Sequence, residues 1–419
     1  MISLHTLANG VRVVCDPMPG LETMALSVVA GRGARGEDLA RNGWSHLLEH
    51  MVFKGAGDRS ARDIAEVIEA EGGQINAATG YERTSFQVRA LAGGMDLASS
   101  VLSDLVLRPT LSPADLAREK QVVGQEIAEA ADTPDDLVFE MAQRAAFGDQ
   151  PLGRPILGTE ASIAPATPEA LEAWRNALYA PESLVVAAAG AVDAGQLLAL
   201  AERDFGGAHG ASSPVSSHAA FIGGAKAQTK SLEQANLVFL LPTVGSAHPD
   251  YFALRLFVEI LGGGMASRLF QEAREKRGLA YAVDAYADTY HDQGVLGVFA
   301  GCSAKDAAEL AAVAAGEIVK LSRRVEPAEL ARAKAQLKAG LFMGRESPLA
   351  RSEHAAGQVL LFGRTLAASE LAADIDAVDT ADLTRIGLGL LAAGKCAVSV
   401  LGPKAAMKAG TAFERALFN

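Results

Sequence analysis

Apolar and polar residues alternate along this chain with two different periods, which predict short strands and amphipathic helices. In the first half, segments with the pattern of strands lie at 11–14, 25–30, 75–91 (two strands joined by a turn) and 183–190. Segments with the pattern of helices lie around His46 and at 60–69, 94–107 and 112–130. Ser60 and Ser112 stand where helix N-caps are expected. The first half is therefore expected to be an α+β domain.

The second half is expected to repeat this order of elements. Its predicted strands lie at 236–241, 279–287, 294–300 and 396–401, and its predicted helices at 248–261, 265–277, 304–322 and 327–345. The segment 113–120 closely resembles 327–334, which anchors the repeat. Between 206 and 226 the composition changes to Gly, Ala, Ser and His with little periodicity, as in a linker.

These patterns predict an α+β fold made of two repeated domains of related fold. Each domain is expected to be a mostly antiparallel sheet with helices packed on one face. The predicted boundaries are an N-terminal domain at 1–207, a linker at 208–226 and a C-terminal repeat domain at 227–419.

Composition excludes several classes of function. With 21% charged residues and a net charge of −12, the chain lacks the concentrated Lys and Arg of a nucleic-acid surface. We expect no membrane span, because no run of 18 apolar uncharged residues occurs, and the N-terminus has the pattern of neither a signal nor a transit peptide. Cys15, Cys302 and Cys396 lack metal-ligand spacing and are expected to be buried, reduced thiols. Together these features predict a cytoplasmic protein.

The candidate chemistry is concentrated in His46-Leu47-Leu48-Glu49-His50. In a helix, the two histidines are four residues apart and Glu49 is three after His46, so all three project on or near one face. Neutral imidazoles bind Zn²⁺ well, and a nearby carboxylate can accept a proton from water. We predict that His46 and His50 bind zinc and that Glu49 is the general base. The alternative is a partly buried amphipathic helix whose histidines are satisfied by neighbours.

A catalytic zinc site also needs a third protein ligand, and a later helix of the same half offers candidates. Glu119 and Glu126 are seven residues apart, hence two turns along nearly the same face, and Glu129 follows. Spacing alone does not choose among the three, and each could be a solvated surface residue. In the repeated half, Ala333 and Gly340 replace Glu119 and Glu126, and the histidine motif is missing too. The glutamates thus occur together with the histidines, which favours a common site.

The H-x-x-E-H pattern and its surroundings resemble the pitrilysin-like zinc peptidases, or inverzincins, and especially the short mitochondrial-processing-peptidase-like subunits of bacterial type. In that family a zinc-binding Glu follows about 75 residues later, with a further functional Glu seven residues before it. This chain has Glu126 and Glu119 at those places, and the resemblance extends to Phe53-Lys54-Gly55 and 151–158. It implies one Zn²⁺ per chain with Glu126 as the third ligand.

The resemblance also implies roles for residues that are not metal ligands. It assigns catalytic roles to Glu49 and Glu119, and substrate binding with transition-state stabilisation to Arg274 and Tyr281. A guanidinium and a phenol can both donate hydrogen bonds to a developing oxyanion, which suits this role. Without the resemblance, the pair would be interpreted as a surface Arg beside a core Tyr.

The strand that contains Asn76, Ala77 and Ala78 is expected to bind substrate. Its edge could pair with an extended peptide through main-chain hydrogen bonds, with loose sequence preference. The chain departs from the family at Ala56, where Thr is frequent, and at Phe86, where Tyr is frequent. The second departure puts only a hydroxyl contact in doubt.

The resemblance implies a zinc-dependent endopeptidase that hydrolyses peptides or presequence-like segments bound in extended form inside a dimeric chamber. The chamber of that family has four such domains and this chain supplies two, so we expect a homodimer; a heterodimer with a related subunit is the alternative. A rival hypothesis is a non-catalytic scaffold or assembly subunit of the same fold. A closed structural zinc site is disfavoured, because no Cys-rich set of four ligands is visible.

Overall fold

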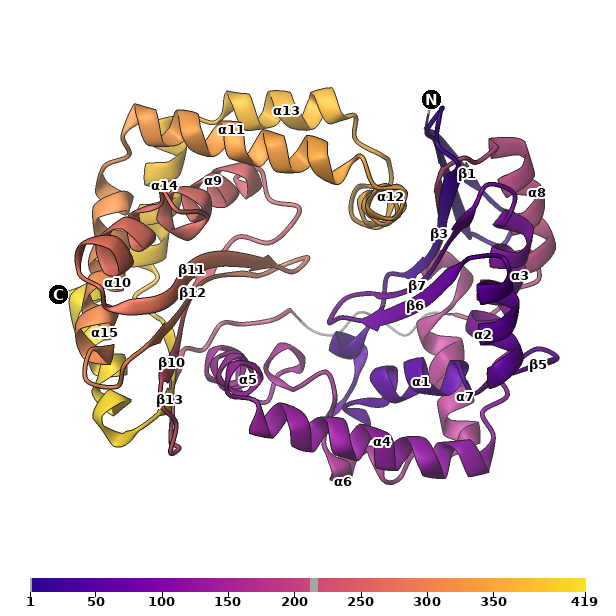
Figure 1. The fold of residues 1–419 in the computed structure, drawn as a ribbon, viewed down its shortest axis with the longest axis horizontal. Coiled ribbons are helices and arrows are strands. Elements are labelled where there is room, and N and C mark those ends of the chain that lie inside the picture. Colours follow the sequence, from indigo (N-terminus) through magenta and orange to yellow (C-terminus); the bar gives the residue numbers. More distant parts are fainter. Residues whose placement is uncertain (1, 212–217) are drawn as a thin grey trace. The chain divides into compact units, whose positions relative to one another are not determined.

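The computed structural model describes residues 2–211 and 218–419, which form two compact units (Figure 1). Unit 1 contains the described residues 2–128, 155–211 and 342–366. Unit 2 contains residues 129–154, 218–341 and 367–419. Each unit therefore includes one segment from the opposite half of the chain. The predicted division, with a single linker after residue 207, did not contain this exchange of segments. Residues 212–217 of the predicted linker lie outside the described residues.

Unit 1 is built on a six-stranded sheet. In spatial order its strands are β1 (Ser3–Thr6), β2 (Arg12–Pro17), β8 (Leu184–Gly190), β3 (Thr23–Ala30), β7 (Thr84–Leu91) and β6 (Gln74–Thr79). β2 and β8 pair in parallel, and the other neighbours are antiparallel. β8 is buried along its whole length, which explains its continuous run of apolar residues. β6 lies at one edge of the sheet.

Helices cover both faces of this sheet (Figure 1). The helices of unit 1 are α1 (Trp44–Val52), α2 (Ala61–Ala70), α3 (Met95–Leu107), most of α4 (Pro113–Asp132), α6 (Glu160–Ile163), α7 (Pro168–Leu178), α8 (Ala194–Phe205) and α12 (Pro348–Phe362). A short hairpin, β4 (Gly55–Ala56) and β5 (Arg59–Ser60), follows α1. Ser60 caps α2 as predicted, in a reciprocal capping box with Asp63.

Helix α12 comes from the second half of the chain and packs on the face of the sheet opposite the main core. Its Ala356 and Val359 contact Val29 and Val185, whose neighbours in β3 and β8 point to the other face. Arg351 of α12 adds two hydrogen bonds to Asp16, at 2.7 and 2.6 Å. The helix is therefore an integral part of unit 1.

Unit 2 is built on a five-stranded sheet with the same arrangement. In spatial order its strands are β11 (Ala280–Thr289), β12 (Gly294–Cys302), β10 (Ala235–Thr243), β13 (Ala397–Gly402) and β9 (Gly224–Thr229). Its helices are α5 (Pro134–Phe147), α9 (Tyr251–Gly262), a π-helix (Phe270–Lys276), α10 (Ala307–Arg323), most of α11 (Pro327–Gly344), α13 (Ala368–Ala377), α14 (Thr380–Ala392) and α15 (Ala409–Phe418). α5 packs on β10 and β13, where Ser399 donates a hydrogen bond to the carbonyl of Val138.

The two sheets confirm the predicted fold class. β6, β7, β3, β8 and β2 correspond in order to β11, β12, β10, β13 and β9, and the last pair is parallel in both sheets. The prediction placed helices on one face of each sheet. In addition, one helix from the other half of the chain covers part of the second face, α12 in unit 1 and α5 in unit 2. β9, α5, α7, α8 and the helices from α12 to α15 were not predicted, and 265–277 contains a π-helix instead of a continuous α-helix.

Two further predictions concern the chain as a whole. Cys15, Cys302 and Cys396 are buried and free, as predicted. Among the residues that the structure describes, no helix has both the length and the apolar character needed to cross a membrane.

Candidate metal centre

Helix α1 presents its polar residues on one face because its apolar residues are buried on the other. Leu47 and Met51 are fully buried in the core of unit 1, whereas His46, Glu49 and His50 are partly exposed. The period of the helix thus produces the predicted grouping of two imidazoles and a carboxylate.

The N-terminus of α1 is held by a buried carboxylate from the preceding loop. Glu37 accepts hydrogen bonds from the backbone N–H groups of Gly43 and Ser45, at 2.8 and 2.7 Å, and from the Asn42 amide. Gly43 itself has a φ of 90° and provides no side-chain cap. Burial raises the pKa of Glu37, and these hydrogen bonds oppose that shift. The loop therefore replaces the usual capping residue and fixes where the helix begins.

His46, His50 and Glu126 converge as potential metal ligands. One nitrogen of each histidine and one Glu126 oxygen all lie within 4.8 Å of one another. Glu126 Oε2 is 3.8 Å from His46 Nε2 and 3.5 Å from His50 Nε2. Ligand atoms on a tetrahedral zinc ion, with bonds of about 2.1 Å, stand roughly 3.4 Å apart. These side chains therefore fit a zinc ion with little adjustment.

The surroundings of His46 favour its neutral form. Burial, and secondarily the nearby His50, lowers the pKa of His46 to about 4. Neutral imidazole is the form that binds a metal, so no proton has to be released at neutral pH. The side chain of Glu126 is 37% exposed, which leaves one side of the group open to solvent.

Glu119 lies behind His50. Its Oε2 is 3.1 Å from His50 Nδ1, its Oε1 is 2.9 Å from Lys54 Nζ, and the residue is buried. A carboxylate on the second nitrogen of a ligating histidine fixes the orientation of the ring and increases its basicity. Glu119 was predicted as catalytic; its contacts correspond to a positioning residue. Glu129, the third candidate, is exposed.

Glu49 is tied to the edge strand of the sheet. The Thr79 hydroxyl, at the end of β6, donates a 2.5 Å hydrogen bond to Glu49 Oε2. Burial raises the pKa of Glu49, and the bond from Thr79 partly opposes this shift. The predicted general base is therefore held at the end of the strand that carries the predicted peptide-binding residues.

Asn76, Ala77 and Ala78 lie on β6, whose second edge pairs with no strand in the described part of unit 1. Phe86, which pairs with Ala77, is buried and packs edge-on against Tyr179. An aromatic ring without a hydroxyl suits this core position.

Arg274 and Tyr281 belong to unit 2, and each lies at an irregularity of the backbone. Arg274 is in the π-helix with its guanidinium 4.8 Å from the Phe270 ring, and Tyr281 lies at a β-bulge at the start of β11. Tyr281 is 66% exposed. π-helical turns and bulges are frequent at functional sites, where they redirect side chains.

Three residues of the centre were not predicted as site residues: Glu37, Lys54 and Thr79. Lys54 and Thr79 lie within segments that the sequence analysis had already used, Lys54 in Phe53-Lys54-Gly55 and Thr79 in the predicted strands at 75–91. Glu37 gave no local signal, because its partners follow it across an irregular loop.

Comparison with known families gives two matches that together cover most of the chain. Residues 12–160 match Insulinase (Peptidase family M16), and residues 165–337 match the Peptidase M16 inactive domain. The histidine motif lies in the first segment, and Arg274 and Tyr281 lie in the second.

Named relatives and solved structures agree with these matches. A protein from Rickettsia bellii that is named an uncharacterized zinc protease is 34% identical, over 96% of this chain and 97% of its own. The uncharacterized zinc protease YmxG of Bacillus subtilis is also 34% identical, over 90% of this chain and 93% of its own. Two solved structures share the fold. A protease from Helicobacter pylori has a TM-score of 0.88 at 20% identity, over 96% of this chain and 99% of its own. A chain of Complex III2 from Candida albicans has a TM-score of 0.88 at 20% identity, over 100% of both chains.

Proposed function

The chain belongs to peptidase family M16, the pitrilysin-like or insulinase family, and on this premise we propose that it is a zinc-dependent endopeptidase acting on extended peptides. The observation that carries the proposal is the convergence of His46, His50 and Glu126 from two helices that are far apart in the sequence. Relatives that match over nearly their whole length are named zinc proteases, which supports it.

A zinc ion bound by His46, His50 and Glu126 would act as a Lewis acid and make water a stronger acid near neutral pH. Glu49 accepts the proton of the attacking water and returns it to the amine that leaves. Thr79 keeps the carboxylate of Glu49 in place through its hydrogen bond.

The free edge of β6 binds the peptide. Main-chain hydrogen bonds from an added strand hold a substrate with little dependence on sequence. Because Thr79 ends β6 and contacts Glu49, a peptide paired with Asn76, Ala77 and Ala78 runs past the general base. Arg274 and Tyr281 donate hydrogen bonds to the peptide backbone and to the oxyanion.

We propose that two copies of the chain form the working enzyme, because each copy carries one catalytic set and one Arg274–Tyr281 pair. A heterodimer with a related subunit would serve the same purpose. The competing function is a non-catalytic scaffold of the same fold. A scaffold does not require the complete set of metal-binding and catalytic residues, which is His46, Glu49, His50, Glu119 and Glu126. The cytoplasmic location stays a prediction from the sequence.

The decisive experiment combines metal analysis with a peptide assay. The purified protein is expected to contain about one zinc per chain and to cleave a quenched fluorogenic peptide. A chelator should abolish cleavage, and added zinc should restore it. Cleavage that persists in the metal-free protein would contradict the proposal, and zinc-loaded protein without activity on a mixed peptide library would favour the scaffold.

A further inference from the structure

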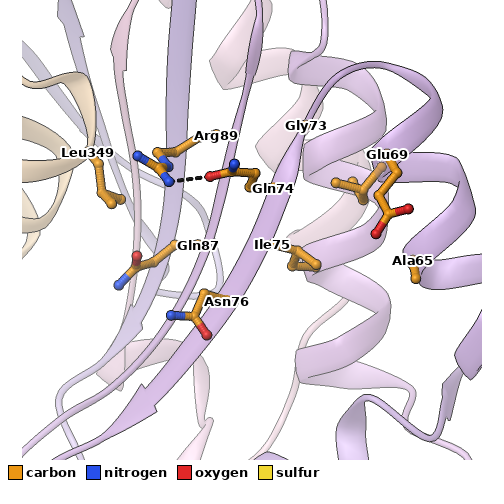
Figure 2. Close-up of a pocket in the computed structure, with 10 residues that line it drawn as sticks. Ala65, Glu69, Gly73, Gln74, Ile75, Asn76, Gln87, Arg89 and Leu349 are labelled. Carbon is orange, nitrogen blue, oxygen red and sulfur yellow. Dashed lines mark hydrogen bonds between the residues drawn. The ribbon is translucent and has the colours of Figure 1, made fainter.

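A cavity of about 580 Å³ lies along the first residues of β6, at the end of the strand opposite Thr79 (Figure 2). Gln74, Ile75 and Asn76 of β6 line it, together with residues of β7, α2 and α12. Its volume is within the range of about 300–1,000 Å³ that is typical of ligand sites. The cavity therefore has room for side chains of a peptide that pairs with β6.

The two sides of β6 differ in chemistry. Gln74 and Asn76 pair with Arg89 and Gln87 of β7, and these four residues share the polar face that α12 partly covers. Ile75 points to the opposite face, toward α2 (Figure 2). Ala65, Ile68 and Glu69 of α2 line the cavity there. Successive residues of a strand point to opposite faces, so neighbouring residues of a bound peptide would meet a polar and an apolar surface in turn.

Arg89 supplies the positive charge of the polar face. Its guanidinium donates a hydrogen bond to the Gln74 side chain, which brings the charge from β7 to the edge strand (Figure 2). Within the described part of the chain, no carboxylate forms an ion pair with Arg89. Glu353 of α12, a carboxylate on the same face, is bonded to Gln87. The remaining N–H groups of Arg89 can therefore bind an added carboxylate.

The distance from the general base locates this subsite on the substrate. Thr79 contacts Glu49, while Gln74 and Asn76 precede Thr79 by five and three residues on the same strand. A peptide in register with β6 would place the residue facing Arg89 about three to five residues from the bond that is cut.

We infer that this cavity is a specificity subsite that takes an acidic side chain of the peptide, Asp or Glu, against Arg89. The neighbouring peptide residue lies on the apolar surface of Ala65 and Ile68. The inference rests on the proposed function, because it assumes that a peptide pairs with β6.

The test is a comparison of cleavage profiles on a mixed peptide library. For the wild type, Asp and Glu are expected to be favoured over Lys and Arg by about tenfold at one position three to five residues from the cut. Arg89→Glu should reverse this preference at the same position. Arg62→Glu is the matched control, since Arg62 lies on the exposed side of α2 outside the cavity; its profile should equal that of the wild type.

Failure of the inference is distinguishable from failure of the proposed function. Identical profiles for the wild type and Arg89→Glu, in enzymes that both cleave, would overturn the subsite and leave the peptidase intact. In the absence of cleavage, fluorescence anisotropy of two labelled peptides that differ only by Glu or Lys at this position decides the question. Tighter binding of the Glu peptide, reversed in Arg89→Glu, supports the subsite; equal affinities overturn it.

Discussion

Glu49 and Glu119 both lie close to the histidines, but their contacts differ. Glu49 accepts a hydrogen bond from Thr79, the last residue of β6, whereas Glu119 contacts Lys54 and the second nitrogen of His50. Proton transfer requires a carboxylate that can reach the reacting water, and ring orientation requires one that contacts the histidine. The two residues should therefore fail in different ways when they are replaced.

Glu49→Gln should retain zinc and lose hydrolysis. The amide keeps the shape of the side chain but cannot accept a proton, so kcat should fall by about 10²–10⁴-fold. Zinc content from elemental analysis should equal that of the wild type. Unchanged turnover of a fluorogenic peptide by this variant would remove Glu49 as the general base.

Glu119→Ala should weaken zinc binding by about 10–100-fold, because His50 loses the carboxylate that orients its ring. The affinity can be measured by competition with a chromogenic chelator, and Glu119→Gln should be less affected because its amide oxygen can still accept a hydrogen bond. Glu129→Ala, on the same helix but exposed, is the control. Equal zinc affinity in Glu119→Ala and Glu129→Ala would argue against a positioning role.

At the scale of residues, the sequence predicted best where spacing within one helix determines proximity. His46, Glu49 and His50 lie on one face because of the helical period alone. The choice among Glu119, Glu126 and Glu129 depended on a resemblance, since the packing of α4 against α1 is a tertiary contact. Glu37 could not be predicted, because its role depends on the path of an irregular loop.

At the scale of elements, the position of helix α1 depends on Glu37. Glu37→Ala would leave the buried N–H groups of Gly43 and Ser45 without this acceptor and should lower the free energy of unfolding by about 2–3 kcal/mol. Asp38→Ala, next to it but exposed, removes the cap of a short surface turn and should cost less than about 1 kcal/mol. Urea unfolding checks both variants, and equal losses would contradict the role of Glu37.

The docking of α12 in unit 1 gives a second prediction at this scale. Asp16→Ala should cost about 2–4 kcal/mol, because Arg351 would keep a mostly buried charge without the carboxylate that binds it. Asp149→Ala removes a partner from an exposed pair with Arg144 and should cost less than about 1 kcal/mol. If a double-mutant cycle between Asp16 and Arg351 showed no coupling, the pair would not anchor the helix.

Periodicity could not predict that α12 packs on the sheet of unit 1 and α5 on the sheet of unit 2. An amphipathic pattern shows that a helix has an apolar face, but it does not show which sheet that face covers. β9 was missed for a related reason: it is exposed along its whole length and lacks the apolar alternation of a half-buried strand.

At the scale of the whole molecule, the two units share one topology but differ in chemistry. Unit 1 carries the two histidines and Glu126, whereas α9, the counterpart of α1, is largely buried and apolar. Unit 2 instead carries Arg274 and Tyr281 on backbone irregularities. The repeat was predictable from the similarity of 113–120 and 327–334, and so was this asymmetry. Complementary functions of the two repeats are compatible with an enzyme in which sites form between copies.

A mixture of two inactive variants tests this assembly. Glu49→Gln lacks the general base and Arg274→Ala lacks a substrate-binding group, so each homodimer should be inactive. If Arg274 acts on the metal centre of the partner, half of the randomly mixed dimers contain one intact site, and the mixture should recover about a quarter of wild-type activity. Different affinity tags on the two variants, recovered together after purification on one tag, should show that exchange has occurred. Complete exchange without recovered hydrolysis would show that Arg274 does not act across the dimer.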